Sequence, residues 1–486
     1  MARTTLHLEH VMRRAGFGAS PADLSALAGL SMTGAVQHVL GYEDRPDDVD
    51  DKIGRAEYVS VTARGATGFS PNTNIEDARQ RWLFRMAHTE RPLKEKMVLF
   101  WHNHFATAYS KVAGTFGAVH GTKMMALKPG ALPGPPGQIE LFRSRALGSF
   151  EDLLVEVAKD PAMLVWLDGR TNTRQRPQEN FGREIMELFT FGLGHYTEED
   201  VYAAARVFTG WNLRLVARGG EPNDYYEFVY VPGNHDVAAK TFTFPIYRDG
   251  TKTIPARAAG AGMQDGLDFI AALAHHPATA ERLARRFWSF FVSEAIEPDP
   301  DFVRGAVSIY LLNDTRIGPV VQYALQSRWF QNPTNWHSRY AWPVEYVVRA
   351  IKEVGWVGYS IDNARAPLVA MGQQLFEPPD VNGWELGRGW FSSGAMLARM
   401  NFASAIAANQ RFNLARAAGV ARGSVGEFGD FFLDRLSPAP YDQGPSDELK
   451  AYLTATGAWT GTDAQLQQKS AGLVRLIVGS AEYQLV

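Results

Sequence analysis

The spacing of apolar residues is helical over most of the chain, and it constrains the fold more than any other feature. Apolar side chains recur every three or four positions, which is typical of helices that press one face against a core. Segments with this spacing are residues 21–40, 76–105, 150–158, 180–191, 198–209, 266–275, 277–292, 300–312, 343–354, 393–408 and 463–478. Capping patterns open several of them, as at Ser20, Thr197 and Asp299. We therefore predict a mostly α fold.

Strand-like patterns are confined to residues 228–231 and 241–244, where aromatic and β-branched residues cluster. They predict at most a small β-hairpin or a pair of edge strands.

Four segments interrupt the helical pattern, at residues 128–138, 217–224, 358–367 and 436–447. The first is so rich in Pro and Gly that only a loop or a lid is compatible with it. None has the length or low complexity of an interdomain linker, and no internal repeat is visible. The sequence thus predicts a single large helical domain over residues 1–486 with long loops, whose region 421–462 is variable.

Composition supports a folded chain and excludes several classes of function. Of the 486 residues, 45% are hydrophobic and 12% aromatic, which is ample for a large core, and 21% are charged, which argues against disorder. The net charge of −3 gives no field that would attract nucleic acid or anionic lipid. We expect no nucleic-acid partner.

The chain has no cysteine. Disulfides, iron–sulfur clusters and thiol catalysis are therefore excluded, and any metal must be held by His, Asp or Glu. Walker, G-x-G-x-x-G, G-x-S-x-G and H-E-x-x-H motifs are also missing from the sequence, so nucleotide, serine-hydrolase and zincin functions lose their usual support.

Charged residues interrupt the N-terminus every few positions, unlike the apolar run of a signal peptide. No stretch of eighteen apolar residues is present, so no membrane span is expected. As written, the chain is predicted to be cytoplasmic, with export as the open alternative.

An acidic helix is the strongest candidate for chemistry. At about 100° per residue, Asn180, Arg183, Glu184 and Glu187 fall on one stripe, and a glycine-flanked turn then brings back His195. Neighbouring carboxylates are costly to bury unless a cation or a shared proton lies between them. We predict Glu184, Glu187, His195 and Arg183 as catalytic residues. The alternative is the solvated face of an amphipathic helix.

Two histidine clusters are candidate metal ligands. His102 and His104 flank Asn103, although a helix would turn the two imidazoles about 200° apart unless it ended at Trp101. His235 and Asp236 follow each other in a polar loop. These four side chains suit a divalent metal such as Mn, Fe or Zn. The alternative is hydrogen-bonded histidines of the core.

A rigid, aromatic segment provides candidate substrate contacts. Residues 377–384 read EPPDVNGW, and Trp390 follows shortly after. Trp384 and Trp390 could stack on a sugar or another flat ligand, and Asp380 and Asn180 could hydrogen-bond it. The alternative is that both tryptophan side chains are packed in the hydrophobic core.

Short sequence motifs distributed over nearly the whole chain together resemble those of the bacterial DUF1800 family. The resemblance rests on HVMRRAGFG (10–18), KEKM (94–97), FWHNHF (100–105), KDPAM (159–163), residues 179–196, ARVFTGW (205–211), HD (235–236), KTF (240–242), residues 376–384 and SAEYQ (480–484). It implies a mostly helical single domain and a sulfatase-like DUF1501 partner, but no reaction.

Several functions fit these residues. The favoured hypothesis is an enzyme that uses the His/Glu pocket for carboxylate acid/base or divalent-metal chemistry, such as hydrolysis of a glycan or another polymer. A metal-dependent oxidoreductase is the next hypothesis. A non-catalytic envelope or assembly protein working with the sulfatase-like partner is the third. A haem protein with an axial His102 or His104 lacks an attachment motif.

Overall fold

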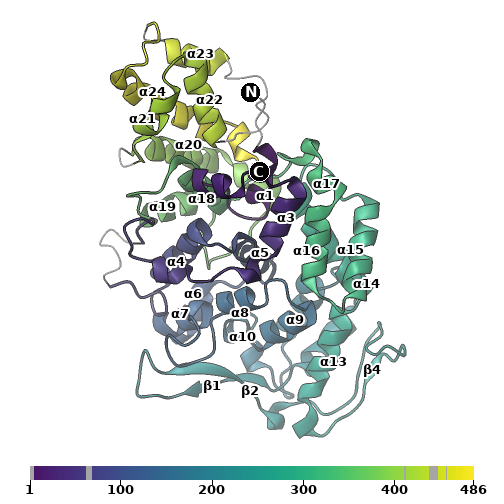
Figure 1. Cartoon of the computed structure of the whole chain (residues 1–486). Coiled ribbons are helices and arrows are strands. Elements are labelled where there is room, and N and C mark those ends of the chain that lie inside the picture. Colours follow the sequence, from purple (N-terminus) through teal and green to yellow (C-terminus); the bar gives the residue numbers. More distant parts are fainter. Residues whose placement is uncertain (1–4, 62–67, 410–411, 437–446, 456) are drawn as a thin grey trace.

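Helices make up most of the computed structural model (Figure 1), which describes residues 5–61, 68–409, 412–436, 447–455 and 457–486. The first half of the chain contains α1 (Leu6–Arg14), α2 (Pro21–Leu27), α3 (Met32–Leu40), α4 (Ile75–His88), α5 (Pro92–His104), α6 (Tyr109–Phe116), α7 (Ala118–Ala126), α8 (Gln138–Ser144), α9 (Phe150–Lys159), α10 (Pro161–Trp166), α11 (Glu179–Glu184) and α12 (Glu198–Val207). The second half contains α13 (Met263–Ala274), α14 (Pro277–Phe287), α15 (Pro300–Leu312), α16 (Ile317–Gln326), α17 (Arg328–Gln331), α18 (Pro343–Val354), α19 (Asp362–Ala370), α20 (Ser393–Ala407), α21 (Leu414–Ala417), α22 (Val425–Leu436), α23 (Asp447–Thr454) and α24 (Asp463–Val478). The predicted mostly α, single-domain fold is confirmed.

Local sequence signals explain where many helices begin and break. Ser20 and Asp23 form a reciprocal capping box at α2, and Thr197 and Asp200 do the same at α12. The predicted segment 76–105 is two helices, because Pro92 can begin a helix but cannot continue one. The predicted break at 358–367 is wrong in part, since α19 begins at Asp362 and contains Pro367.

Two short antiparallel sheets interrupt the helices. Strand β1 (Trp211–Val216) pairs with β2 (Tyr225–Tyr230), and β3 (Lys240–Thr241) pairs with β4 (Thr253–Ile254). The two predicted strand segments therefore do not pair with each other. Each is paired instead with a segment that was not predicted to be a strand, and residues 217–224 form the turn between β1 and β2.

Helix α5 lies at the centre of the fold. All of its residues except Lys94 are buried, and Trp101 is 0% exposed. A helix enclosed on every side carries no polar stripe, so the sequence does not show which of its faces is functional. The loop at 128–138 that precedes α8 is confirmed.

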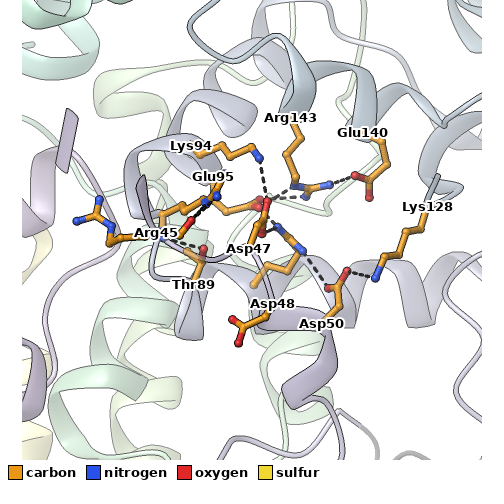
Figure 2. A network of polar contacts seen from close by, with 12 residues as sticks. Arg45, Asp47, Asp48, Asp50, Thr89, Lys94, Glu95, Lys128, Glu140 and Arg143 are labelled. Carbon is orange, nitrogen blue, oxygen red and sulfur yellow. Dashed lines mark hydrogen bonds and ion pairs between the residues drawn. The ribbon is translucent and has the colours of Figure 1, made fainter. Parts of the chain in front are cut away.

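A buried ionic network fixes the start of α5. Glu95 accepts hydrogen bonds from Arg85 of α4 (2.7 Å) and Arg143 of α8 (2.7 and 3.0 Å), and all three side chains are nearly inaccessible. Figure 2 shows how this centre continues to Asp47 and Asp50 in the segment after α3. Since the partners come from four separate segments, the network ties them together.

The C-terminal helices α20 to α24 gather at one end of the molecule (Figure 1). The last residues return to the core, where Gln484 accepts a hydrogen bond from the backbone N–H of Ala341 and the guanidinium of Arg349 lies 3.9 Å from the ring of Tyr483. Of the predicted break at 436–447 and the variable region 421–462, residues 437–446 and 456 lie outside the described part. No helix in the described ranges combines the length and the apolarity needed to cross a bilayer.

Candidate functional site

A pocket of about 670 Å³ runs beside α14. One face of α14 and of the π-helical turn that continues it (Trp288–Val292) forms a wall of the pocket. The residues of this wall are Ala278, Glu281, Arg282, Arg285, Arg286, Ser289 and Phe290. The other walls come from the end of α5, the loop at 191–195, and residues 294, 342 and 382–386.

The sequence of α14 explains this orientation. Its N-cap, His276, accepts a hydrogen bond from the backbone N–H of Ala278 (3.1 Å), and Pro277 occupies the first helical position. The apolar face, with Leu283 and Phe287, is buried in the core. The basic residues lie on the other side and line the pocket, where Arg282 and Arg286 are half-buried and Arg285 is exposed.

Arg286 is the most unusual group in this pocket. Its side chain is partly buried, and within the described residues its guanidinium has no hydrogen bond and no ion pair. Burial, followed by the nearby charge of Arg282, lowers the pKa of Arg286 to about 10. A guanidinium stays charged at neutral pH even so, and an enclosed charge without a counterion is unfavourable. The guanidinium also lies over the ring of Phe100, 5.8 Å from its centroid, and it lines the pocket with unused hydrogen-bond donors.

The charged neighbours of Arg286 are already engaged. Arg282 donates to the carbonyl of Leu188 (3.2 Å), and Arg285 forms an exposed ion pair with Glu281 (2.8 Å). Burial raises the pKa of Glu294, although Arg339 opposes the shift. One carboxylate oxygen of Glu294 accepts a hydrogen bond from the backbone N–H of Tyr340 (3.0 Å).

Aromatic rings and one amide complete the pocket. Phe290, Trp342 and Trp384 contribute to its walls. The side-chain oxygen of Asn103 accepts a hydrogen bond from the backbone N–H of Trp384 (2.7 Å), which fixes the 382–386 loop against α5. In the described structure, the amide nitrogen of Asn103 makes no hydrogen bond and is available to a ligand.

Gly383 allows this loop to approach α5. Its φ is +83°, and a Cβ atom there would lie 2.3 Å from the side-chain oxygen of Asn103. We expect Gly383→Ala to displace the loop and to lower the free energy of unfolding by roughly 1–3 kcal/mol, from backbone strain and the lost contact. Chemical denaturation measures this change. Gly394→Ala, which meets no atom within 4 Å, is the control. Equal stability of the two variants would show that the close approach is unimportant.

The predicted acidic cluster lies beside the pocket and does not line it, except through His195. His195 is exposed and lines the pocket near its rim. Burial and then the charge of Glu187 raise the pKa of Glu184, and Glu187 accepts a hydrogen bond from the hydroxyl of Tyr196. The charge of Glu187 also acts on the pocket residue Arg282.

The other two predicted residues of this helix are turned toward solvent. Arg183 forms a bidentate ion pair with the exposed Glu198 (2.7 Å for both bonds), and the exposed Asn180 donates to Asp168 (3.3 Å). The regular stripe predicted from 100° per residue also ends early. Helix α11 stops at Glu184 and a π-helical turn, Ile185–Phe189, follows, which changes the phase of the later side chains.

The predicted metal ligands are dispersed, which corrects that part of the sequence analysis. α5 continues to His104, so the imidazoles diverge: His102 accepts from the backbone N–H of Phe376 (3.2 Å), and His104 contacts the carbonyl of Phe189 (3.0 Å). Both are buried, and burial lowers the pKa of His102 to about 3. They behave as hydrogen-bonded histidines of the core.

His235 and Asp236 also point to separate structural partners. His235 lies between the carbonyl of Thr209 (2.8 Å) and the carboxylate of Asp265 (3.2 Å), and Asp236 pairs with Arg206 (2.7 Å). Across the ranges that the structure covers, no group of three His, Asp or Glu side chains could hold a metal ion. The prediction of a metal at these residues is therefore unsupported.

Of the predicted substrate contacts in the segment 377–390, some line the pocket and others do not. Trp384 and Trp390 are both 4% exposed, so both plug the core, but Trp384 also presents an edge to the pocket. Asp380 is exposed and accepts a hydrogen bond from the backbone N–H of Asn382 (2.8 Å), which shapes the turn. Asn382, which was not predicted, lines the pocket instead.

Sequence reasoning missed the arginines of α14. The segment 282–291 reads RLARRFWSFF, in which three arginines are followed by four aromatic residues. That pattern was a usable signal, because basic residues on a solvated face are not usually followed by so many large rings.

Comparison with known proteins places the whole chain in one family. The family model described as "Protein of unknown function (DUF1800)" matches residues 10–485. No curated protein and no solved structure matches the chain. With a match over nearly its full length, and with a helical single domain as the resemblance implied, the chain belongs to the DUF1800 family.

Proposed function

We propose that the protein is an enzyme that binds an acidic glycan or a similar anionic polymer in the pocket beside α14 and hydrolyses it. The observation that carries the proposal is Arg286, whose unpaired guanidinium faces a pocket of ligand size. A ligand carboxylate or sulfate would supply the missing counterion and form strong charge-assisted hydrogen bonds.

The rest of the pocket suits a sugar. The edges of Trp342 and Trp384 add apolar surface to the pocket wall, and the amide of Asn103 and the carboxyl of Glu294 can hydrogen-bond hydroxyl groups. Such a mixture of aromatic walls and a few polar groups is typical of small-molecule sites.

Hydrolysis is supported by the carboxyl groups near the pocket. A general acid needs a pKa closer to neutrality than that of a free carboxyl group, and burial raises the pKa of both Glu294 and Glu184. Glu294 lines the pocket, whereas Glu184 lies beside it, so Glu294 is the better-placed proton donor. The sulfatase-like DUF1501 partner implied by the family resemblance fits the same proposal, because sulfated glycans are anionic.

The proposal is tested with Arg286→Gln. We expect this variant to bind oligogalacturonate roughly 10- to 100-fold more weakly than the natural protein, because one charge-assisted hydrogen-bonding group is lost. Quenching of tryptophan fluorescence measures the affinity, since two tryptophans border the pocket.

Arg304→Gln is the matched control, because Arg304 is exposed, pairs with Asp301 and lies outside the pocket. Neutral maltooligosaccharides should bind neither the natural protein nor the variants tightly. If neither oligogalacturonate nor a sulfated glycan oligomer binds the natural protein, the proposed function is wrong.

A further inference from the structure

The pocket is elongated along the axis of α14. Its wall extends from Ala278 to Phe290 on one helical face, with members three or four positions apart. At 1.5 Å per residue these twelve steps cover about 18 Å. A single compact ligand would leave much of such a groove empty, whereas a chain-like ligand could lie along it.

The chemistry changes along this groove. Arg282, Arg285 and Arg286 occupy successive positions of its middle section, and Phe290 with Trp342 occupies the end farther along the chain. Arg286, which has unused donors, would hold an anionic group in the middle section. The aromatic end would contact an apolar part of the ligand.

A second hollow, of about 570 Å³, is lined by residues that directly precede those of the first pocket along α14. It is lined by His275, His276 and Pro277 at the start of α14, and the first pocket resumes at Ala278. The ring of His276 lies 5.9 Å from that of His195, which lines the first pocket, so these two imidazoles form the ridge between the hollows.

The second hollow also offers a cation to a ligand. Arg248 lines it and is exposed, and in the described ranges its guanidinium has no ion pair. The two carboxylates that also line it, Glu151 and Asp314, both contact His275 (3.0 and 3.5 Å). Tyr247, whose hydroxyl donates to Asp268 (2.6 Å), holds the same loop in place. The charge of Arg248 thus lies on one side of the His195–His276 ridge, and Arg286 lies on the other.

We infer that the two hollows form one binding cleft for an extended anionic polymer, which lies along α14, crosses the His195–His276 ridge and reaches Arg248. This inference rests on the proposed function and specifies its substrate class: several consecutive acidic units of a polymer, not a free acidic monomer. The enzyme then acts on chains and not on their released end products.

The experiment measures affinity against ligand length. Galacturonate oligomers from one to eight units are titrated into the natural protein, Arg286→Gln, Arg248→Gln and the control Arg304→Gln. We expect the affinity of the natural protein to rise at least 10-fold from the monomer to the longest oligomer. Arg286→Gln should weaken binding at every length, and Arg248→Gln should weaken only the longer oligomers, by about 3- to 10-fold.

The outcomes separate the inference from the proposed function. An affinity independent of length, with Arg286→Gln still defective, would overturn the extended cleft and leave the proposed function standing. An equal effect of Arg248→Gln at all lengths, or no effect at any, would also overturn it. Failure of every acidic ligand to bind would overturn both. Since Arg248 is exposed, its substitution should not disturb folding, and thermal melting of each variant verifies this.

Discussion

Replacing Glu95 by glutamine is expected to lower the free energy of unfolding by about 3–5 kcal/mol. Glu95 is 0% exposed and is the shared acceptor of Arg85 and Arg143. The glutamine would leave both guanidinium groups buried with less than their full counter-charge. Because these residues join α4, α5 and α8, the loss should reach the centre of the fold. The shift in denaturant midpoint measures it, provided that the slope of the transition is unchanged.

The carboxylate of Glu95 also makes the stability of the fold depend on pH. Burial alone would raise the pKa of Glu95, but Arg143 and Arg85 outweigh it and lower that pKa from 4.5 to about 2. A carboxyl whose folded-state pKa is depressed contributes stability that is fully present above its unfolded pKa. The contribution of Glu95, about 3 kcal/mol for this shift, should therefore be lost as the pH falls from about 4.5 to about 2.

Glu90→Gln provides the control. Glu90 is exposed and pairs with Lys52 (3.1 Å), so its loss should cost less than about 1 kcal/mol. In Glu95→Gln the loss of stability on acidification should be smaller than in the natural protein. Similar destabilisation by the two substitutions would mean that the network of Figure 2 does not stabilise the centre of the fold.

Replacing Glu345 by glutamine is expected to cost a similar 3–5 kcal/mol and also to disturb the pocket. Glu345 forms ion pairs with Lys96 and with Arg339 (2.8 Å), and both cations are 0% exposed. It also accepts a hydrogen bond from the backbone N–H of Trp342 (2.8 Å) at the start of α18. Two buried cations would lose their common anion, and a pocket residue would lose its anchor.

A second substitution distinguishes charge from packing in this case. Lys96→Met combined with Glu345→Gln removes one of the stranded cations, so it should recover part of the lost stability. Fluorescence of the pocket tryptophans, and oligogalacturonate affinity, should change in Glu345→Gln and only slightly in Glu90→Gln. A Glu345→Gln protein with natural stability and affinity would contradict the expected role of this ion cluster.

The fold could be predicted from the sequence because its main determinants are local. Apolar spacing, capping residues such as Thr197 and Asp200, and prolines such as Pro92 act within a few residues of where they stand. The pairing of strands could not be predicted in the same way. The partners of residues 228–231 and 241–244 depend on tertiary contacts. Residues 211–216 (WNLRLV) do alternate apolar and polar side chains, but this local pattern does not say which segment they pair with.

The candidate site was predicted at the level of segments and not of side chains. The end of α5, the loop at 191–195 and the segment 382–386 lie around one pocket. Yet Asn103 lines the pocket, and the predicted residues His102 and His104 do not. Because α5 is buried on all sides, its sequence pattern does not indicate which side chains face a pocket. Arg286 was missed because an arginine on an amphipathic helix normally faces solvent, and only tertiary packing encloses it.

The two π-helical turns, Ile185–Phe189 and Trp288–Val292, have a consequence for comparing members of the family. Each accommodates one residue more than a regular helical turn. A relative lacking that residue would wind continuously, and every side chain after the gap would be rotated by about 100°. The number of residues between Arg286 and Glu294 is therefore a marker that can be read directly from an alignment. We expect members that keep this number to keep the orientation of Arg286 relative to Glu294, and members with a single-residue deletion there to lose it.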